Sequence, residues 1–533
     1  MLNTTAPQQH RVHDGTSRGA TMIQAEPGSP EYWATHRPDR IAVISGATHL
    51  TYKQWNDAAD RVAEGLAQQG LRPGDRIGMR FRLAAEWFVV QRALQKLGVA
   101  QVAVNWRLTP DEAMYILRDS EAKGLACNDI DISGWARNDI GVLVTVGQDG
   151  SAAGVRYEDL LQTHDAPARF GPARPSLVLY TSGTTGRPRG VPPVDPTTIT
   201  DPGRLARYIS SVGGTPPLPD GVTTLLTLPI HHGAGPDAVA RACRHGGTVV
   251  TLDPFDAENA IRLIAERKIQ SWGTVPTMLL RIQNLPAEIL DRHDLSSIEQ
   301  IGVGAAPVPH SLKEWVIDRF GNDVLWEHYG ASEAGMISYT APEHQRSKPG
   351  TSGHPYDGVD IAIVDEQWQR LPVGEAGEIA VSTPIVLRRY LGGPELGEDV
   401  IKDGFYRTGD VGYLDEDGFL FITDRIKDMI VAGGVNIYPA EIEKALVSHP
   451  HVVDAAVIGI PDDDFGEKPL AFIVPAVTAP TEAELSAYLD GRLARYKRPR
   501  QFVFVDELPR NSIGKVVKHQ LRQPYWEGRE RNV

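Results

Sequence analysis

Residues 180–190 combine more phosphate-binding chemistry than any other part of this 533-residue chain. They read Tyr-Thr-Ser-Gly-Thr-Thr-Gly-Arg-Pro-Arg-Gly, and the glycines let backbone N–H groups approach an anion closely. Hydroxyl groups and two arginines add the donors and charge that a polyphosphate-binding loop needs. The apolar run at 177–180 predicts a buried strand that leads into the loop. Flexible surface loops share this composition, but the ordered motif favours a phosphate site.

Six further motifs follow the loop in the order of one known family. Together with the loop they resemble the signature of the adenylate-forming superfamily: acyl-CoA synthetases, peptide-synthetase adenylation domains and firefly luciferase. The resemblance extends over residues 30–525 and is strongest to acyl-CoA synthetases. The motifs are Leu-Pro-Ile-His at 228–231, Gly-Ala-Ala-Pro at 304–307, Tyr-Gly-Ala-Ser-Glu at 329–333, Tyr-Arg-Thr-Gly-Asp at 406–410, Asp-Arg-Ile-Lys-Asp at 424–428 and Pro-Arg-Asn-Ser-Ile-Gly-Lys at 509–515.

The resemblance implies which residues hold the ATP phosphates. Arg189 stands where the family usually has lysine, so it keeps the charge but replaces a point charge with a planar fork. We expect it to act in catalysis nonetheless. The remaining phosphate contacts implied by the family are Thr181, Ser182, Gly183, Thr184 and Thr185.

The motif at 329–333 resembles the family's adenine and magnesium site. Glu333 would be the magnesium ligand and a catalytic residue, since magnesium prefers hard oxygen ligands and commonly uses one carboxylate. Tyr329 would stack on adenine, beside Gly330. Ser332 replaces the usual threonine and keeps a hydroxyl for the α-phosphate. A lone glutamate is usually a solvated surface charge, and only the motif favours the functional interpretation.

The motifs at 406–410 and 424–428 resemble the family's ribose site. The two oxygens of the Asp410 carboxylate can accept hydrogen bonds from both ribose hydroxyls. Arg425 resembles the arginine that also contacts the nucleotide. The alternative for both residues is a structural salt bridge.

The C-terminal lysine carries the strongest catalytic prediction. Lys515 resembles the residue that bridges the carboxylate and the α-phosphate during adenylation, although most lysines are exposed and idle. Lys427 matches the family's hinge, about which a C-terminal domain rotates between two half-reactions. Rotation would bring Gly433 and Gly434 to the site, where glycines leave room for a narrow pantetheine arm. This loop is the evidence for coenzyme A as the acceptor.

The acyl pocket is expected between the motif at 228–231 and small residues farther along. His231 stands at the family's gating position, although a lone histidine is more often a satisfied core residue. Gly235 and Gly302 would leave space for a bulky acyl group. Val-Pro-Pro at 191–193 departs from the family pattern, so the resemblance does not predict the shape of the pocket wall there. The resemblance implies that Gly304, Ala305 and Ala306 bind the nucleotide, and Gly304 and Ala305 are expected on the pocket wall opposite His231.

The pattern of apolar residues predicts the elements that position these motifs. A helix over 51–70, a strand over 77–81, a helix over 84–97 and a strand over 99–104 form a βαβ unit with a parallel sheet. Residues 31–50 suggest an opening segment with short strands. Beyond 345 short strands predict a β-rich subdomain, and Asp-Glu-Asp-Gly at 415–418 predicts a tight turn. A helix is expected from Pro439, and another over 482–493.

The fold class expected is therefore α/β with three structural parts. A disordered leader covers 1–29, and a large N-terminal domain covers 30–426, with parallel-rich sheets, covering helices and a β-rich subdomain over about 345–426. A mobile α+β lid domain covers 427–533. A length of 533 residues fits two to four such units.

Composition limits the partners. The net charge of −14 opposes non-specific binding to nucleic acid or anionic membrane. No stretch approaches the roughly 20 apolar residues of a membrane span, and the leader lacks the apolar core of a signal peptide. Two cysteines provide no disulfide framework, which fits a cytoplasmic protein. The partner expected is a small carboxylic acid, and a homodimer stays open.

The sequence thus predicts an ATP-dependent, magnesium-dependent carboxylate–CoA ligase that works through an acyl-adenylate. Two alternatives stay open for the acceptor: an amine, giving an amide, or a carrier-protein thiol. A third alternative is a non-catalytic nucleotide-binding regulator, against which the retained Lys515, Glu333 and Asp410 argue, since binding alone would not need the lysine. The identity of the acid is not readable from the sequence.

Overall fold

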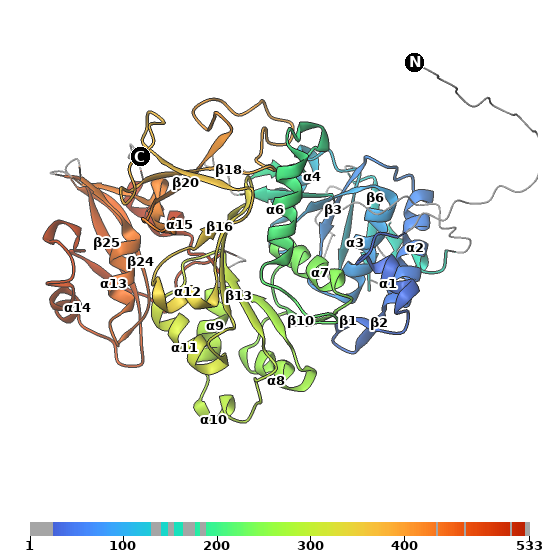
Figure 1. The fold of residues 1–533 in the computed structure, drawn as a ribbon, viewed down its shortest axis with the longest axis horizontal. Coiled ribbons are helices and arrows are strands. Elements are labelled where there is room, and N and C mark those ends of the chain that lie inside the picture. Colours follow the sequence, from blue (N-terminus) through green and yellow to red (C-terminus); the bar gives the residue numbers. More distant parts are fainter. Residues whose placement is uncertain are drawn as a thin grey trace, which may run out of the picture.

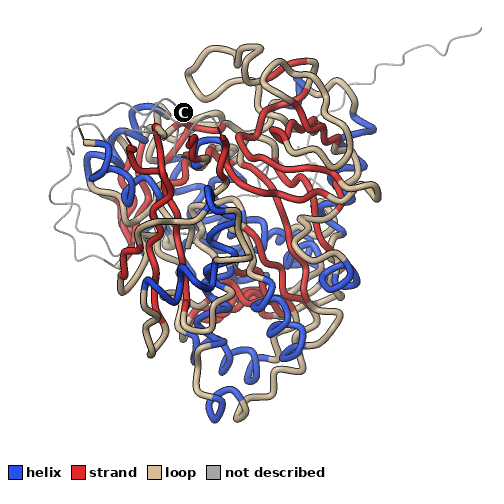
Figure 2. Tube along the Cα trace, turned by 90° about the vertical axis from the view of Figure 1, so that its left-hand side faces the viewer, coloured by secondary structure: helices blue, strands red, loops and turns tan. Residues whose placement is uncertain are grey.

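The computed structural model describes residues 25–128, 140–147, 154–163, 176–181, 188–432, 435–462, 465–511 and 514–527. Its described strands form four sheets, and the chain runs from a blue and green half to an orange and red C-terminal part (Figure 1). Figure 2 looks from the C-terminal side and shows strands through the body of the molecule, with helices and loops at its lower end. This is the expected mixed α/β class.

Two parallel-rich sheets build the first two thirds of the chain. The first has the order β16-β15-β14-β13-β12-β10-β11-β1-β2 and the second β7-β6-β5-β3-β4-β8-β9. The first contains β1 (Ile41–Ser45), β2 (Thr48–Thr51), β10 (Thr223–Leu226), β11 (Thr248–Thr251), β12 (Ser271–Thr274), β13 (Gln300–Gly304), β14 (Leu325–Ala331), β15 (Gly335–Thr340) and β16 (His354–Pro355). The second contains β3 (Arg76–Arg80), β4 (Ala100–Ala103), β5 (Gly124–Asn128), β6 (Val142–Val146), β7 (Val155–Arg156), β8 (Leu177–Thr181) and β9 (Arg189–Val191).

Two smaller sheets follow. One has the order β17-β18-β20-β19, with β21 paired to β20, and the other β23-β22-β25-β24, with β26 paired to β25. They contain β17 (Asp360–Val364), β18 (Gly377–Ser382), β19 (Ile401–Lys402), β20 (Phe405–Leu414) and β21 (Leu420–Arg425), then β22 (Ile430–Ala432), β23 (Val435–Ile437), β24 (Val452–Asp462), β25 (Gly466–Pro475) and β26 (Phe502–Phe504). The tight turn expected at 415–418 joins β20 to β21. The domain bounds themselves stay a prediction.

Helices cover the sheets and close the chain. They are α1 (Pro30–His36), α2 (Tyr52–Gln68), α3 (Ala85–Leu97), α4 (Pro110–Asp119), α5 (Tyr157–Leu160), α6 (Pro202–Gly214), α7 (Ala234–Arg244), α8 (Ala257–Arg267), α9 (Pro276–Gln283), α10 (Ala287–Leu290), α11 (His310–Phe320), α12 (Pro342–Ser347), α13 (Pro439–Val447), α14 (Glu482–Leu489) and α15 (Lys518–Trp526), with 3-10 turns η2 (Pro196–Thr198), η3 (Ile426–Asp428) and η4 (Arg495–Lys497).

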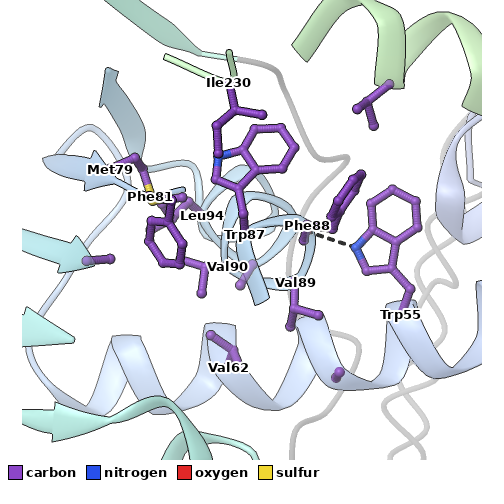
Figure 3. Packing of buried hydrophobic residues seen from close by; sticks show 14 of the residues in the cluster. Trp55, Val62, Met79, Phe81, Trp87, Phe88, Val89, Val90, Leu94 and Ile230 are labelled. Atoms are coloured by element: carbon purple, nitrogen blue, oxygen red, sulfur yellow. Dashed lines mark hydrogen bonds between the residues drawn. The ribbon is translucent and has the colours of Figure 1, made fainter. Parts of the chain in front are cut away.

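The predicted βαβ unit is confirmed. Strands β3 and β4 pair in parallel, and α3 between them ends where Gly98 adopts a φ of +72°. Thr51 caps α2 instead of starting it, in a capping box with Gln54. Where α2 crosses α3, the Trp55 indole nitrogen donates to the Phe88 carbonyl at 2.9 Å, and their rings meet edge to face (Figure 3).

Two local predictions were incomplete. The opening segment contains helix α1 as well as the two short strands; Ser29 caps it and Pro30 occupies its first turn, a signal that the sequence offered. The helix expected over 482–493 ends at Leu489, because Asp490 is already extended and Gly491 has a φ of +78°. The first case is thus a missed helix and the second a boundary placed too late, and local capping and backbone conformation at the helix ends account for both.

A glycine joins the first sheet to the β20–β21 sheet. Gly353 has a φ of +85° and bridges Leu420, and a Cβ there would meet the Tyr339 carbonyl oxygen. Gly374 has the same kind of φ, +86°, but a Cβ there would meet no described atom within 4 Å.

These two glycines give a matched pair for a stability measurement. Gly374→Ala should cost only the backbone strain, about 1–2 kcal/mol. Gly353→Ala should cost about 1–3 kcal/mol more, because the added atom overpacks against backbone. Thermal unfolding of the two variants checks this, and equal midpoints would contradict the close approach at Gly353.

Candidate active site

Glu333 lies in the turn between β14 and β15, opposite the end of β8. Its Oε1 accepts hydrogen bonds from the Thr181 hydroxyl at 3.2 Å and the Tyr390 hydroxyl at 3.3 Å. Thr181 is therefore beside Glu333, as a phosphate loop next to a metal ligand requires. The rest of the predicted loop lies outside the described residues: Ser182, Gly183, Thr184 and Thr185.

Arg189 lies on the same edge. It pairs with Thr181 across the β8–β9 hairpin, and its guanidinium carbon is 5.3 Å from the centre of the Tyr390 ring. Stacking on an aromatic ring suits a planar guanidinium better than an ammonium group. The substitution of the family's lysine is thus accompanied by a ring that orients the arginine.

The carboxylate of Glu333 is suited to binding a hard cation. Both hydroxyl contacts are longer than the usual 2.7–2.8 Å, and among the described residues no lysine or arginine forms an ion pair with this carboxylate. The described residues include no group of three or more metal-ligating side chains. Magnesium typically uses one or two protein carboxylates plus phosphate oxygens, so a single glutamate beside a phosphate loop fits it.

Asp410 forms the second polar centre. This buried residue of β20 accepts from the Tyr329 hydroxyl at 2.6 Å and from Arg425 Nε at 2.8 Å. Antiparallel pairing places Arg425 of β21 directly opposite Asp410. Burial, followed by the Asp410 charge, raises the pKa of Tyr329 well above its usual value, so the phenol stays protonated. A carboxylate held by a neutral phenol and one arginine keeps lone pairs for a sugar.

The turns around this centre need small residues. Gly330 follows Tyr329 at a β-bulge, and a Cβ there would be 2.6 Å from the Gly335 carbonyl oxygen. A Cβ at Gly304 would be 2.7 Å from the His328 carbonyl oxygen. Ala305 has a φ of +67°, a strained conformation for a residue other than glycine and one that clusters at ligand sites. Ala306 follows it, and Ser332 is exposed beside Glu333.

Lys515 reaches the site from the C-terminal part of the chain. Burial lowers the pKa of its ammonium group to about 8, and the next largest cause is the positive charge of Arg425; Lys427 lowers it further, while Asp410 opposes this. Its backbone N–H donates to Asn511 Oδ1 at 2.9 Å. The lysine therefore lies near the ribose-site candidates Asp410 and Arg425.

A close contact holds the turn that carries Lys515 against helix α9. Gly514 has a φ of +75°, and a Cβ there would lie 2.5 Å from the hydroxyl of Thr277 in α9. The turn that carries Lys515 is therefore docked against the large N-terminal part without room for a side chain. Thr277 and Tyr390 could not be identified from the sequence, because neither lies in a family motif.

The lowered pKa of Lys515 predicts how the adenylation rate depends on pH. Lys515 is cationic below about pH 8 and neutral above it. We expect kcat/KM for adenylation, measured as ATP–pyrophosphate exchange without CoA, to fall about tenfold per pH unit above that value. Lys515→Arg should lack this alkaline limb, because arginine stays charged. An identical limb in the arginine variant would assign the titration to another group.

Lys427 lies in η3, at the junction that was predicted to be a hinge. Burial and the Arg425 charge lower the pKa of its ammonium group. Its neighbour Asp428 forms an ion pair with Arg522 of α15 at 3.0 Å, which ties the junction to the last helix. Gly433 and Gly434, expected to enter the site after rotation, lie outside the described residues.

The predicted gate and pocket residues come from two segments: His231 and Gly235 around the start of α7, and Gly302 in β13. His231 is buried, neither ring nitrogen has a described hydrogen-bond partner, and burial lowers its pKa to about 3, so the ring is neutral. A Cβ at Gly235 would meet the Pro229 carbonyl oxygen at 2.6 Å, so this glycine lets the backbone pack closely at the start of α7. Gly302 faces the imidazole of His328, which would be 3.5 Å from its Cβ.

Comparison with known proteins agrees with this geometry. The AMP-binding enzyme family matches residues 30–391, and the AMP-binding enzyme C-terminal domain matches residues 441–515. The chain is 35% identical over 503 residues to a 2-succinylbenzoate–CoA ligase of Bacillus licheniformis, covering 94% of this chain and 100% of the relative. It is 32% identical over 527 residues to the fatty acid–[acyl-carrier-protein] ligase ScoC of Streptomyces coeruleorubidus, covering 96% and 98%.

A solved structure shares the whole arrangement. The o-succinylbenzoate CoA synthetase MenE from Bacillus subtilis, in complex with its acyl-adenylate intermediate OSB-AMP, superposes with a TM-score of 0.78 at 30% identity. The match covers 93% of this chain and 98% of that one. No described helix is long and apolar enough to cross a membrane. The chain belongs to the AMP-binding enzyme family, within the adenylate-forming superfamily.

Proposed function

We propose that this protein is an ATP-dependent carboxylate–CoA ligase that works through an acyl-adenylate. The observation that carries the proposal is the position of Lys515, docked through Gly514 against Thr277 and close to Asp410 and Arg425. A protein that only bound nucleotide would not need a lysine delivered from its C-terminal end to the nucleotide site.

The first half-reaction joins the acid to AMP. A carboxylate oxygen attacks the α-phosphorus of ATP, the bond to the bridging oxygen breaks, and pyrophosphate leaves with that electron pair. The transition state carries negative charge on phosphoryl oxygens, so catalysis depends on positioning and electrostatic stabilisation. Lys515 and Arg189 supply positive charge, and Asp410 orients the ribose. Glu333 would hold magnesium, which would supply further neutralisation of the phosphates.

The second half-reaction transfers the acyl group. The thiolate of coenzyme A attacks the acyl carbonyl, and AMP leaves as the mixed anhydride breaks. We assign the change of active site to rotation about Lys427, which removes Lys515 and brings in Gly433 and Gly434. Cys127 and Cys243 form no disulfide, as in a reducing compartment, and we propose a cytoplasmic enzyme.

One experiment tests both halves. Pyrophosphate release is screened with aliphatic, aromatic, alicyclic and steroid-type acids, and the adenylate formed is then offered CoA, amines and holo-carrier protein separately. We expect acid-dependent pyrophosphate release and consumption of the adenylate by CoA. Consumption by an amine or a carrier thiol instead would make the protein an amide synthetase or a carrier-protein ligase. Absence of release with every acid would favour a nucleotide-binding regulator.

A further inference from the structure

Helix α13 takes its N-terminal cap from a distant part of the chain. Its first helical residue is Pro439, and the residue before it, Tyr438, forms no capping hydrogen bond through its side chain. The first backbone N–H groups of a helix have no partner within the helix, and a nearby side-chain oxygen normally accepts from one of them. In α13 the Ala440 N–H donates to Asp424 Oδ2 at 2.9 Å, and the two residues are 16 positions apart.

Asp424 is fixed on the other side of the predicted hinge. It lies in β21, where antiparallel pairing with β20 sets it next to the Asp410–Arg425 pair of the ribose-site candidates. Its side chain is buried, and Oδ1 accepts from the Arg425 backbone N–H at 2.7 Å. Lys427 lies between Asp424 and α13 in the chain. The hydrogen bond to α13 therefore spans the hinge, and a rotation that carries α13 away from β21 must break it.

The Asp424 carboxyl group is charged at neutral pH. Burial raises its pKa to about 6; the charge of Lys518 opposes this shift, and the charge of Glu443 adds to it. A hydrogen bond to a carboxylate is stronger than one between neutral groups, and a negative charge at a helix N-terminus meets the positive end of the helix dipole. The cap is therefore a favourable contact while α13 lies against β21.

Helix α13 is in turn tied to the turn that carries Lys515. Lys518, the first residue of α15, forms an ion pair with Glu443 of α13 at 2.7 Å, and both side chains are mostly buried. Glu443 also accepts from the Val457 N–H of β24 at 2.6 Å, which fixes it to the C-terminal sheet. Lys515 lies just before α15 in the chain. A continuous set of contacts thus leads from Asp424 through α13 and α15 to the catalytic lysine.

We propose that Asp424 is a positioning residue that holds the C-terminal part in the arrangement for adenylation, by capping α13 across the hinge. This inference rests on the proposed two-step ligase function and gives a role to a motif residue to which the resemblance assigned none. Loss of the cap should favour the rotated arrangement, in which this hydrogen bond is already absent. Removal of a helix cap changes such an equilibrium by about two- to thirtyfold.

The test measures the two half-reactions separately in the full-length chain. Asp424→Ala removes the cap, and we expect kcat for ATP–pyrophosphate exchange to fall about tenfold. Thioester formation from synthetic acyl-adenylate and CoA should stay at the wild-type rate or rise, because the cap holds the other arrangement. Asp424→Asn keeps an oxygen that can accept from Ala440, so it should restore most of the exchange rate. A purely structural role of Asp424 would lower both steps together.

Asp256→Ala is the matched control, because Asp256 caps a helix that does not cross the hinge. The Asn259 N–H at the start of α8 donates to Asp256 Oδ1 at 2.8 Å. Both alanine variants should lose a similar amount of thermal stability, but Asp256→Ala should leave the ratio of the two half-reactions unchanged. Equal slowing of both steps by Asp424→Ala, no change in either step, or the same change of ratio in the control would overturn the assignment.

A second measurement follows the arrangement itself and needs no acid. Fluorescent labels on Ile209→Cys in α6 and Val477→Cys after β25 report the distance between the two parts by energy transfer, since both positions are exposed and the two native cysteines are buried. With ATP bound, Asp424→Ala should shift the transfer efficiency from the wild-type value, and the control should not. Unchanged transfer would overturn the role of the cap. Failure of every acid to release pyrophosphate would overturn the proposed function itself, while the transfer measurement still decides whether the cap holds the C-terminal part.

Discussion

Replacing Lys515 by alanine should slow adenylation by about a hundred- to a thousand-fold. One preorganised contact to a charge that develops in the transition state is worth roughly 3 to 4 kcal/mol, and Lys515 supplies such a contact at the α-phosphate. The second half-reaction should be nearly unaffected, because the rotated C-terminal part no longer presents this lysine. The measurements are ATP–pyrophosphate exchange for the first step and thioester formation from synthetic acyl-adenylate and CoA for the second.

The control for this variant is Lys497→Ala, in the same C-terminal part. Lys497 forms an ion pair with Glu441 at 2.7 Å and has no predicted part in the chemistry. Its loss should leave both half-reactions intact. If Lys515→Ala impaired both steps equally with an unchanged melting curve, the two-arrangement mechanism would be wrong for this chain.

Glu333→Gln should weaken adenylation most at limiting magnesium. The amide keeps the shape of the side chain and its oxygen can still accept from Thr181 and Tyr390, but the negative charge that attracts the cation is gone. We expect the apparent magnesium requirement to rise by at least tenfold, with little change in thermal stability. A magnesium titration of pyrophosphate exchange measures this.

Glu343→Gln provides the comparison, since Glu343 is an exposed carboxylate in the first turn of α12. Its magnesium dependence should match the wild type. Equal magnesium curves for Glu333→Gln and the wild type would remove Glu333 from the metal site and leave its hydroxyl contacts as its only role.

The sequence was informative where function imposes a local pattern. Motif residues at strand ends could be predicted to meet, and Thr181, Glu333, Asp410 and Arg425 do lie in two hydrogen-bonded centres. Antiparallel pairing of β20 with β21 explains the second centre, because it sets Arg425 opposite Asp410, whereas the first centre forms where the end of β8 meets the β14–β15 turn of another sheet.

Other parts of the site depend on contacts between distant segments and could not be predicted. Tyr390 reaches Glu333 across 57 residues, and Thr277 meets Gly514 from a helix with no motif.

The positive charges around Lys515 have a consequence for the order of events. Burial, and then the charges of Arg425 and Lys427, hold the pKa of the Lys515 ammonium group down, so the docked arrangement is disfavoured for a charged lysine until a polyanion arrives. The coupling between docking of Lys515 and binding of ATP is reciprocal: if docking tightens ATP binding, ATP must favour docking by the same factor. Near pH 8, Lys515 should therefore take up a proton when ATP binds. Departure of pyrophosphate removes most of that negative charge. Repulsion among the three cations then favours withdrawal of the lysine, so the first product to leave also prepares the second half-reaction.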